Sequence, residues 1–313
     1  MVFVFLTIKS FKDYIMADAH TPQSSNHIML LEPVDFYANP ETMETNSYQH
    51  EQGAKDKSEI QREAQKEFRA MRDLLIEHGV TVTTVLGQEG CPDDIFINWV
   101  STHDGGRMVL YPMLNENRQK ERRKDIIDIL RRTYKDVQDF TLHEQHEKAL
   151  EATGAMCLDR VHKVAYQVRS SRAHDDIAAM WCKMNGYTHI PFDTEYKGKP
   201  VYHADVVMWI GTDLVGICSE CLIKDDIVKH TKHRREVIEF TTEQMEAFCG
   251  NSLEVVGTGG EKMLLMSAGG YKSLRDDQKN LLAKHYKTII KPEIPTIEYY
   301  GGGSARCMVL ELF

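Results

Sequence analysis

Residues 206–218 read VVMWIGTDLVGIC, and this stretch decides the fold class. It holds two strand candidates, Val206–Ile210 and Asp213–Cys218, because each is a short apolar run of the length that buried strands have. A helix is expected next at Thr242–Phe248, and a further strand at Leu253–Val256. The local order is therefore strand, strand, helix, strand.

The same order recurs along the chain, although no residue motif repeats between the units. Each unit takes roughly 50 to 65 residues, a period typical of propeller-like or repeat folds. No Pro- or Ser-rich linker interrupts the pattern, so one α/β domain built from several such units is the simplest prediction. The other expected strands are His27–Leu31, Val80–Leu86, Ile95–Val100, Arg107–Tyr111, Ala155–Leu158, Lys163–Gln167 and Met263–Met266, and the other expected helices are Lys57–His78, Asn117–Tyr134, Asp175–Met184 and Leu274–Tyr286.

Composition narrows the class of protein. With 42% hydrophobic and 27% charged residues, the 313-residue chain has the balance of a soluble globular protein. Its net charge of -9 argues against nucleic acid or a membrane as partner, where a basic face is expected. Seven cysteines, an odd number without dense pairing, indicate free thiols in a reducing compartment, so a cytoplasmic protein is expected.

The N-terminal run MVFVFLTI is apolar for only eight residues. It is too short to span a bilayer and makes a poor signal peptide. Met16 is an alternative start. We expect residues 1–26 to form an extension that can be disordered.

The strongest chemical signal is the stretch Gly301–Cys307, GGGSARC. Three glycines allow a close backbone approach, and a thiol after such a loop can lie near backbone N–H groups that favour the thiolate. We therefore expect Cys307 to have a lowered pKa and to be the cysteine most easily alkylated near neutral pH. The alternative is a flexible tail with a buried cysteine.

A second signal is PVYHAD, residues 200–205. If His203 begins a strand, Asp205 faces the same side two residues later. A neutral histidine near a thiol can take or give a proton close to neutral pH. The alternative is a surface His–Asp pair.

Two further groups of carboxylates are candidates. Asp93 and Asp94 lead into the expected strand Ile95–Val100, and a carboxylate there suits a guanidinium, unless it only caps a turn. Glu151 lies beside the turn at Gly154, where it could orient an imidazole or be the solvated end of a helix.

Two other features are discounted. Cys218 and Cys221 are followed by His230 and His233, but the spacing is tighter than in usual zinc fingers, so no metal is expected. The basic run at residues 118–123, RQKERR, is interpreted as a solvated, salt-bridged helix face.

Together, four segments resemble the guanidino-group-modifying enzymes of the pentein superfamily. Closest in appearance is the branch related to arginine deiminase and amidinotransferase, which includes citrulline-utilisation hydrolases. The resemblance implies an α/β fold, a five-unit propeller of strand-strand-helix-strand units around a central pocket, with residues 27–313 as one catalytic domain. The segments are PDDIFINWVSTHDG (92–105), LEATGAMCLDR (150–160), PVYHADVVMWIG (200–211) and GGGSARCM (301–308).

The resemblance also implies roles for individual residues. Cys307 would be the nucleophile and His203 the general acid/base, with Glu151 hydrogen-bonded to it. Asp93 would bind the guanidino or ureido head of the substrate. Asp205 would be a second carboxylate there; the citrulline-utilisation branch usually has Asn at this position, so Asp favours a cationic guanidinium.

Four more residues complete the expected substrate-binding set and the loop beside it. Gly302, Gly303 and Arg306 would shape the loop that carries the thiol. Asn98 stands alone before Trp99, where the branch tends to have two asparagines.

The expected function is a cysteine-dependent hydrolase of a small arginine- or citrulline-like substrate, working through a covalent Cys307 intermediate without metal or organic cofactor. The alternatives are an amidinotransferase that uses the same intermediate and a non-catalytic binding protein on the same fold. The expected partner is a small guanidino or ureido compound.

Overall fold

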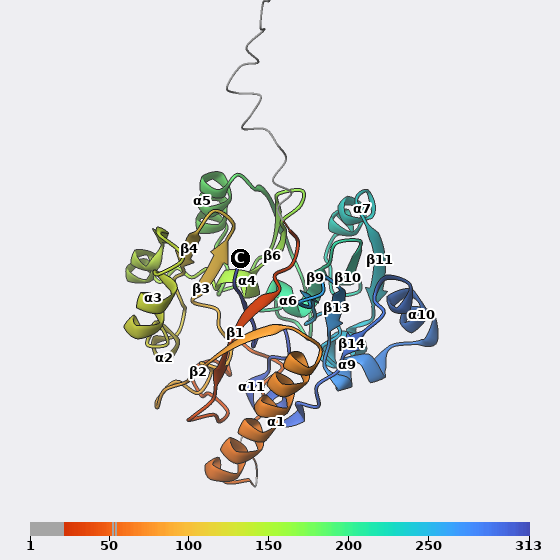
Figure 1. Ribbon diagram of the computed structural model, residues 1–313. Coiled ribbons are helices and arrows are strands. Elements are labelled where there is room, and N and C mark those ends of the chain that lie inside the picture. Colours follow the sequence, from red (N-terminus) through yellow and green to blue (C-terminus); the bar gives the residue numbers. More distant parts are fainter. Residues whose placement is uncertain (1–21, 52, 54) are drawn as a thin grey trace, which may run out of the picture.

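The computed structural model describes residues 22–51, 53 and 55–313. Within them the strands form five sheets of three strands each (Figure 1). In every sheet the middle strand runs antiparallel to one neighbour and parallel to the other. The sheets are β15 (Leu310–Glu311), β1 (His27–Glu32) and β2 (Thr81–Leu86); β3 (Val100–His103), β4 (Arg107–Leu110) and β5 (Asp136–Asp139); β6 (Met156–Asp159), β7 (Val164–Val168) and β8 (Thr188–Phe192); β9 (Met208–Ile210), β10 (Leu214–Cys218) and β11 (Glu236–Phe240); β12 (Leu253–Val256), β13 (Lys262–Leu265) and β14 (Ile289–Ile290).

Helices connect the middle strand of each sheet to its third strand, as a parallel pair requires a crossover connection. This is the predicted order of strand, strand, helix, strand, and the five-unit propeller is confirmed. The unit predicted from residues 206–256 is wrong in its second half, because the helix Asp226–Lys232 and β11 complete the sheet of β9 and β10, and Leu253–Val256 begins the next sheet. The helices are α1 (Lys57–Glu77), α2 (Glu116–Gln119), α3 (Lys124–Leu130), α4 (Ala152–Ala155), α5 (Asp175–Asn185), α6 (Ala204–Val207), α7 (Asp226–Lys232), α8 (Thr242–Glu246), α9 (Ala268–Ser273), α10 (Asp276–His285) and α11 (Pro295–Gly301), with a 3-10 helix at Thr141–His146.

Burial falls from the first strand of each unit to the third. The first strands β3, β6, β9 and β15 are buried along their whole length, whereas the third strands β2 and β5 carry exposed and half-buried residues. First strands of neighbouring units also contact one another, as β15 does β3 and β6 does β9. The first strands therefore line the axis of the propeller, and the third strands form its rim.

The sheet of β15, β1 and β2 joins the two ends of the described chain. Strand β1 pairs with β2 in parallel and with β15 in antiparallel register, with Met29 opposite Leu310. This pairing closes the ring and brings the residues before β15, including Cys307, to the axis.

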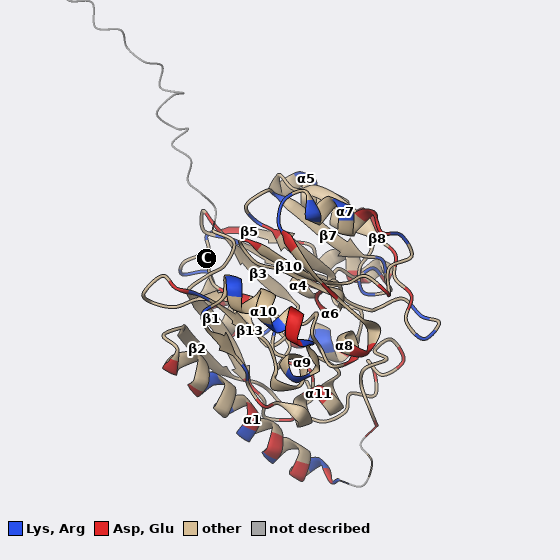
Figure 2. Ribbon diagram, turned by 90° about the vertical axis from the view of Figure 1, so that its right-hand side faces the viewer, with Lys and Arg blue, Asp and Glu red and all other residues tan. Residues whose placement is uncertain are grey.

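Helix α1 shows how a peripheral helix is fixed. Asp56 caps its N-terminus by accepting the Glu59 N–H at 2.8 Å, and Gly79 follows its end with a positive φ of 78°. One face of the helix is buried, and Figure 2 shows that acidic and basic residues occur along its whole length. No helix in the described part of the chain is long and apolar enough to cross a membrane.

Three predicted elements are wrong. The strand predicted at Ile95–Val100 is a turn up to Trp99, in which the Phe96 N–H donates to the Asp93 carbonyl at 2.9 Å. The strand predicted at Val206–Ile210 begins only at Met208, because residues 204–207 form helix α6.

The third is the single helix predicted at Asn117–Tyr134. It is two helices, α2 and α3, because Arg123 between them is extended, with a ψ of 130°. This break lets the Arg118 side chain, 2% exposed, turn into the core, so the prediction of a solvated face is wrong for Arg118.

The N-terminal run MVFVFLTI, Met16 and most of the predicted extension lie outside the described residues. Gln23 belongs to the described end of this extension, and its side chain is buried. The side-chain amide of Gln23 donates to the backbone carbonyls of Leu158 at 2.9 Å and Ile210 at 3.2 Å.

We predict that Gly216→Ala destabilises the protein. A Cβ at this position in β10 would lie 2.2 Å from Trp209 Nε1, so the buried indole must move, at a cost of about 1–3 kcal/mol. Gly269→Ala, on an exposed position of α9 where the nearest atom is 3.4 Å away, is the matched control. Urea unfolding of both variants tests this, and equal stability of the two would contradict it.

Candidate active site

A narrow cavity lies on the axis of the propeller. Only about 10 Å³ of it is open to the centre of a water-sized sphere, which is room for about one water molecule. Segment 39–49, which follows β1, contributes Asn46 to its lining. The cavity is lined by Asn46, Asp93, Phe96, Asn98, Arg118, Arg172, Tyr202, His203, Gly301, Gly303 and Cys307.

Cys307 reaches this cavity with a buried thiol. Its Sγ lies 3.4 Å from Asp205 Oδ2 and 3.0 Å from Asn251 Nδ2. Burial raises the pKa of the thiol well above its usual value, and the Asp205 carboxylate raises it further. The prediction of a lowered pKa is therefore wrong, because burial and the Asp205 carboxylate outweigh the groups that lower it, such as the backbone of the loop.

The three glycines before the thiol allow close packing. A Cβ at Gly301 or Gly303 would lie 2.6 or 3.1 Å from the Phe96 ring. Gly302 ends α11 with a φ of 60°, and a Cβ there would lie 2.6 Å from Asn46 Nδ2. Larger residues would therefore push segment 39–49 and Phe96 away from the cavity.

His203 is the N-cap residue of α6, not a strand residue as predicted, and its imidazole is buried. Its Nε2 lies 2.8 Å from Glu151 Oε2. Since the carboxylate accepts the hydrogen bond, Nε2 carries the hydrogen, and the other ring nitrogen, Nδ1, is left to act as a base. Nδ1 is buried without a hydrogen-bond partner among the described residues. A Cβ at Gly154 would lie 2.6 Å from Nδ1, so this glycine lets the imidazole into the site.

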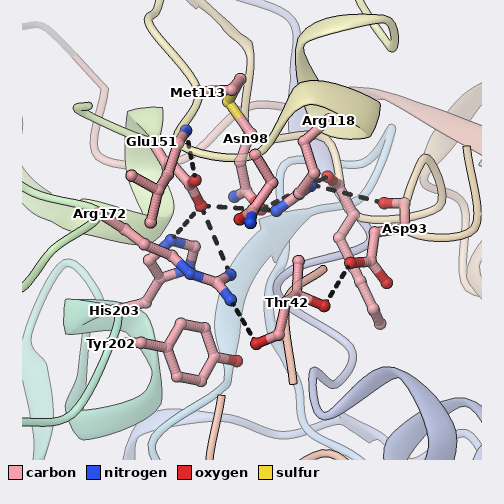
Figure 3. Close-up of polar contacts among 12 residues, drawn as sticks. Thr42, Asp93, Asn98, Met113, Arg118, Glu151, Arg172, Tyr202 and His203 are labelled. Atoms are coloured by element: carbon pink, nitrogen blue, oxygen red, sulfur yellow. Dashed lines mark hydrogen bonds and ion pairs between the residues drawn. The ribbon is translucent and has the colours of Figure 1, made fainter. Parts of the chain in front are cut away.

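Glu151 is the centre of the charged network (Figure 3). Its Oε2 lies 3.5 Å from Arg118 Nη1 and 3.7 Å from Arg172 Nη1, besides its contact with His203. Burial alone would raise the pKa of Glu151, but Arg172, His203 and Arg118 together lower it to about 2. The carboxylate therefore stays charged and fixes the imidazole. The next residue, Ala152, has a φ of 43°, which is strained for a non-glycine residue.

Asp93 faces the cavity from the turn before β3. Its Oδ2 accepts from Asn39 Nδ2 at 2.8 Å and Thr42 Oγ1 at 3.1 Å. Its Oδ1 is buried and has no partner among the described residues. An unpaired buried carboxylate oxygen is costly, and this atom has unused capacity for a donor that the described residues do not supply.

Asp205 lies on the thiol side of the site. Its Oδ1 is 4.0 Å from His203 Nδ1 and likewise lacks a hydrogen bond within the described chain. Burial raises its pKa, while His203 and Arg306 act in the opposite direction. Although the predicted strand is a helix, Asp205 and His203 still converge.

The other predicted residues lie at different distances from the cavity. Asn98 lines it, and its Oδ1 accepts from Arg118 Nη1 at 3.3 Å. Gly303 lines it as well. Arg306 is not in this lining: its Nη1 donates to the Val309 carbonyl at 2.9 Å, and it lines a second cavity that Asp205 also lines.

Sequence reasoning missed several buried polar residues of the site, among them Asn46, Arg118, Arg172 and Asn251. Arg118 was assigned to a solvated run. Arg172, which hydrogen-bonds to Thr45 Oγ1 at 2.6 Å, and Asn251 carry no local signal, since their partners are distant in sequence. In the sequence, one arginine between Ser171 and Ala173 forms neither a periodic pattern nor a charge cluster that would indicate a site.

The discounted zinc ligands lie away from this cavity. Cys218 and Cys221 are buried, and His230 Nδ1 lies 2.7 Å from the Tyr166 hydroxyl. Across residues 22–313 as described, no group of three or more His, Cys, Asp or Glu side chains is arranged to hold a metal ion.

A ring of five small sheets with such a site on its axis defines a class: enzymes of the pentein superfamily, which modify guanidino groups, as the sequence resemblance predicted. A family model described as N,N dimethylarginine dimethylhydrolase, eukaryotic, matches residues 32–313. The chain belongs to this family.

Solved structures agree on the fold. The N-terminal domain of ArgZ, an arginine dihydrolase from cyanobacteria solved with its substrate, has a TM-score of 0.73 at 15% identity, over 91% of this chain and 97% of that one. DDAH from Pseudomonas aeruginosa, solved with citrulline, has a TM-score of 0.66 at 17% identity, over 92% and 100%. Unliganded AgrE has a TM-score of 0.73 at 16% identity, over 92% of this chain and 39% of its own. No curated protein sequence matches the chain.

We predict that Cys307 reacts slowly with iodoacetamide at pH 7 and faster as the pH rises past 9, because its thiol is buried and its pKa is raised. Asp205→Asn removes the neighbouring negative charge, so it should lower the thiol pKa and speed labelling at pH 7. Peptide mapping after timed alkylation measures both rates. Labelling of the other six cysteines is the internal control, and rapid labelling of wild-type Cys307 at pH 7 would refute the prediction.

Proposed function

We propose that this protein is a cysteine-dependent hydrolase of the guanidino group of a small arginine-like substrate. The observation that carries the proposal is the set of three buried atoms with unused hydrogen-bonding capacity around one thiol: Asp93 Oδ1, Asp205 Oδ1 and His203 Nδ1. Two carboxylate oxygens, which are negatively charged hydrogen-bond acceptors, and one base suit a cationic, planar head group with several N–H donors.

The charges of the site support a cationic substrate. The two arginines nearest the cavity, Arg118 and Arg172, are both engaged by Glu151. Among the described residues the open oxygens of Asp93 and Asp205 have no hydrogen-bond partner, and Asp205 Oδ1 is 4.0 Å from His203 Nδ1. A guanidinium held between the two carboxylates would place its carbon near Cys307 Sγ, and this positioning contributes to the rate.

The first half of the reaction forms a covalent intermediate. In the free protein the Cys307 thiol stays protonated beside Asp205. A bound guanidinium offsets the Asp205 charge, the thiol proton passes to His203 Nδ1, and Sγ adds to the guanidinium carbon. His203 then gives this proton to the leaving amine, the C–N bond breaks, and an S-alkylthiouronium remains on Cys307.

The second half uses water. His203 Nδ1 takes a proton from the water that attacks the same carbon. The C–S bond then breaks, the ureido product loses its hydroxyl proton to solvent and leaves, and His203 returns its proton to the Cys307 thiolate. Glu151 keeps the imidazole oriented through both halves. All acid, base and nucleophile roles belong to side chains, so the proposal requires no metal or organic cofactor.

Two measurements test the proposal: the intact mass of the protein, which detects a covalent intermediate on Cys307, and analysis of the products. The panel is arginine, methylated arginines, citrulline, agmatine and guanidinoacetate, scored for ammonia or amine and a ureido product. We expect a cationic member to be hydrolysed, and Cys307→Ala to abolish turnover while keeping its melting temperature. A Cys307→Ala variant that keeps full activity, or a product that carries the amidino group on an added amine, would overturn hydrolysis at Cys307.

We predict that Asp205→Asn shifts the preference between charged and neutral substrates. It removes a charge while it keeps shape, so kcat/KM for a guanidinium substrate should fall about 10–200-fold, from the loss of about 1.5–3 kcal/mol of charge-assisted binding. A neutral ureido substrate should be affected far less. Steady-state kinetics on both substrates decide it, and equal losses on the two would remove the role of the charge.

A further inference from the structure

Asn251 is a completely buried residue that lies in the turn between α8 and β12. The turn packs directly on the backbone of α6, because a Cβ at the preceding Gly250 would lie 2.0 Å from the Val206 carbonyl oxygen. Asn251 is thereby held between two units of the propeller, next to the residues before β15.

Four hydrogen bonds use the whole capacity of its side-chain amide. Its Oδ1 accepts from the backbone N–H groups of Arg306 at 3.0 Å and Cys307 at 3.2 Å. Its Nδ2 lies 3.0 Å from the Asp205 carbonyl oxygen and 3.0 Å from Cys307 Sγ.

These contacts also fix which way the amide points. The opposite orientation would place the NH₂ group against two N–H donors and the oxygen against the Asp205 carbonyl. Nδ2 therefore faces Sγ, and the amide donates to the sulfur.

The charge around the sulfur gives this donor a specific use. Burial and Asp205 raise the pKa of the thiol, whereas the Ser304 backbone and the Asn251 amide act in the opposite direction. A lysine or arginine at this place would stabilise the thiolate too, but its fixed positive charge would repel a cationic substrate. A neutral amide avoids that conflict.

Resting on the proposed function, we propose that Asn251 is a positioning residue that stabilises the Cys307 thiolate by a neutral hydrogen bond and fixes the sulfur relative to Asp205. The thiolate forms when the thiol proton leaves for His203, and the Asn251 N–H then donates to a full negative charge. The hydrogen bond is stronger in that state than to the neutral thiol, so it lowers the barrier to attack.

Two variants separate this role from a purely structural one. Asn251→Ala removes the donor and the acceptor. Asn251→Asp keeps oxygens for the two N–H groups of the loop, but it removes the donor and adds a negative charge beside Sγ. Asn185→Ala is the matched control, since Asn185 also uses both ends of its amide, toward Arg107 and Gln138, far from the site.

We measure the pH dependence of Cys307 alkylation, kcat and KM with the guanidino substrate, and thermal unfolding. We expect Asn251→Ala to lower kcat about 10–100-fold, as for the loss of one hydrogen bond to a charged group, with a rise of about one unit or more in the thiol pKa. Asn251→Asp should raise the pKa further without increasing KM for a cation. Asn185→Ala should leave kcat and the pKa of the Cys307 thiol unchanged.

A thiol pKa equal to that of wild type in folded Asn251 variants overturns the proposal, whether kcat falls or not, because a structural role alone would move stability and not the pKa. If either variant does not fold, Asn251→Ser takes its place: its hydroxyl is too short to span both the loop and Sγ, and the same pKa criterion applies. Activity that persists in Cys307→Ala would instead refute the proposed function, so the two failures are distinguishable.

Discussion

The structure depends on one buried carboxylate. Glu151 is completely buried, and its oxygens face the cations of Arg118 and Arg172 and the imidazole of His203. These three partners come from three separate segments, the helix after β4, the loop after β7 and the start of α6. Removing one member would leave the others buried and unbalanced, which is far more costly than the intact network. The network therefore ties neighbouring units together at the axis and, in the same contacts, orients the imidazole.

The other side of the site is organised around an excess of negative charge. Asp93 and Asp205 each hold one oxygen by hydrogen bonds and leave the second unpaired. Such groups cost stability in the free protein. A cationic head group would recover that cost on binding, and at the same time lower the energy of the Cys307 thiolate. Under the proposed function, binding of the cation and formation of the thiolate are thus coupled through the same carboxylate, Asp205.

Much of the fold could be predicted because the middle strands of the sheets are buried and are seen in the sequence as apolar runs, as in β10 and β7. The helices α4 and α6 could not, since four residues are too few to show a period, and tertiary packing decides their conformation. The motifs located Cys307, His203 and Glu151, which the structure brings together. The direction of the Cys307 pKa was wrong, and Arg172 and Asn251 were missed, because these depend on contacts between units that no local pattern records.

The pairing of β1 with β15 has a consequence for how the protein is made. The partners Ile28 and Glu311 are separated by on the order of 280 residues, so β1 emerges from synthesis long before the strand that covers its second edge. Until then the apolar strand HIMLLE has one edge with unsatisfied backbone groups, which is a template for pairing with another chain. Intermolecular association should therefore compete with ring closure during refolding, and the yield of native protein should fall as the protein concentration rises.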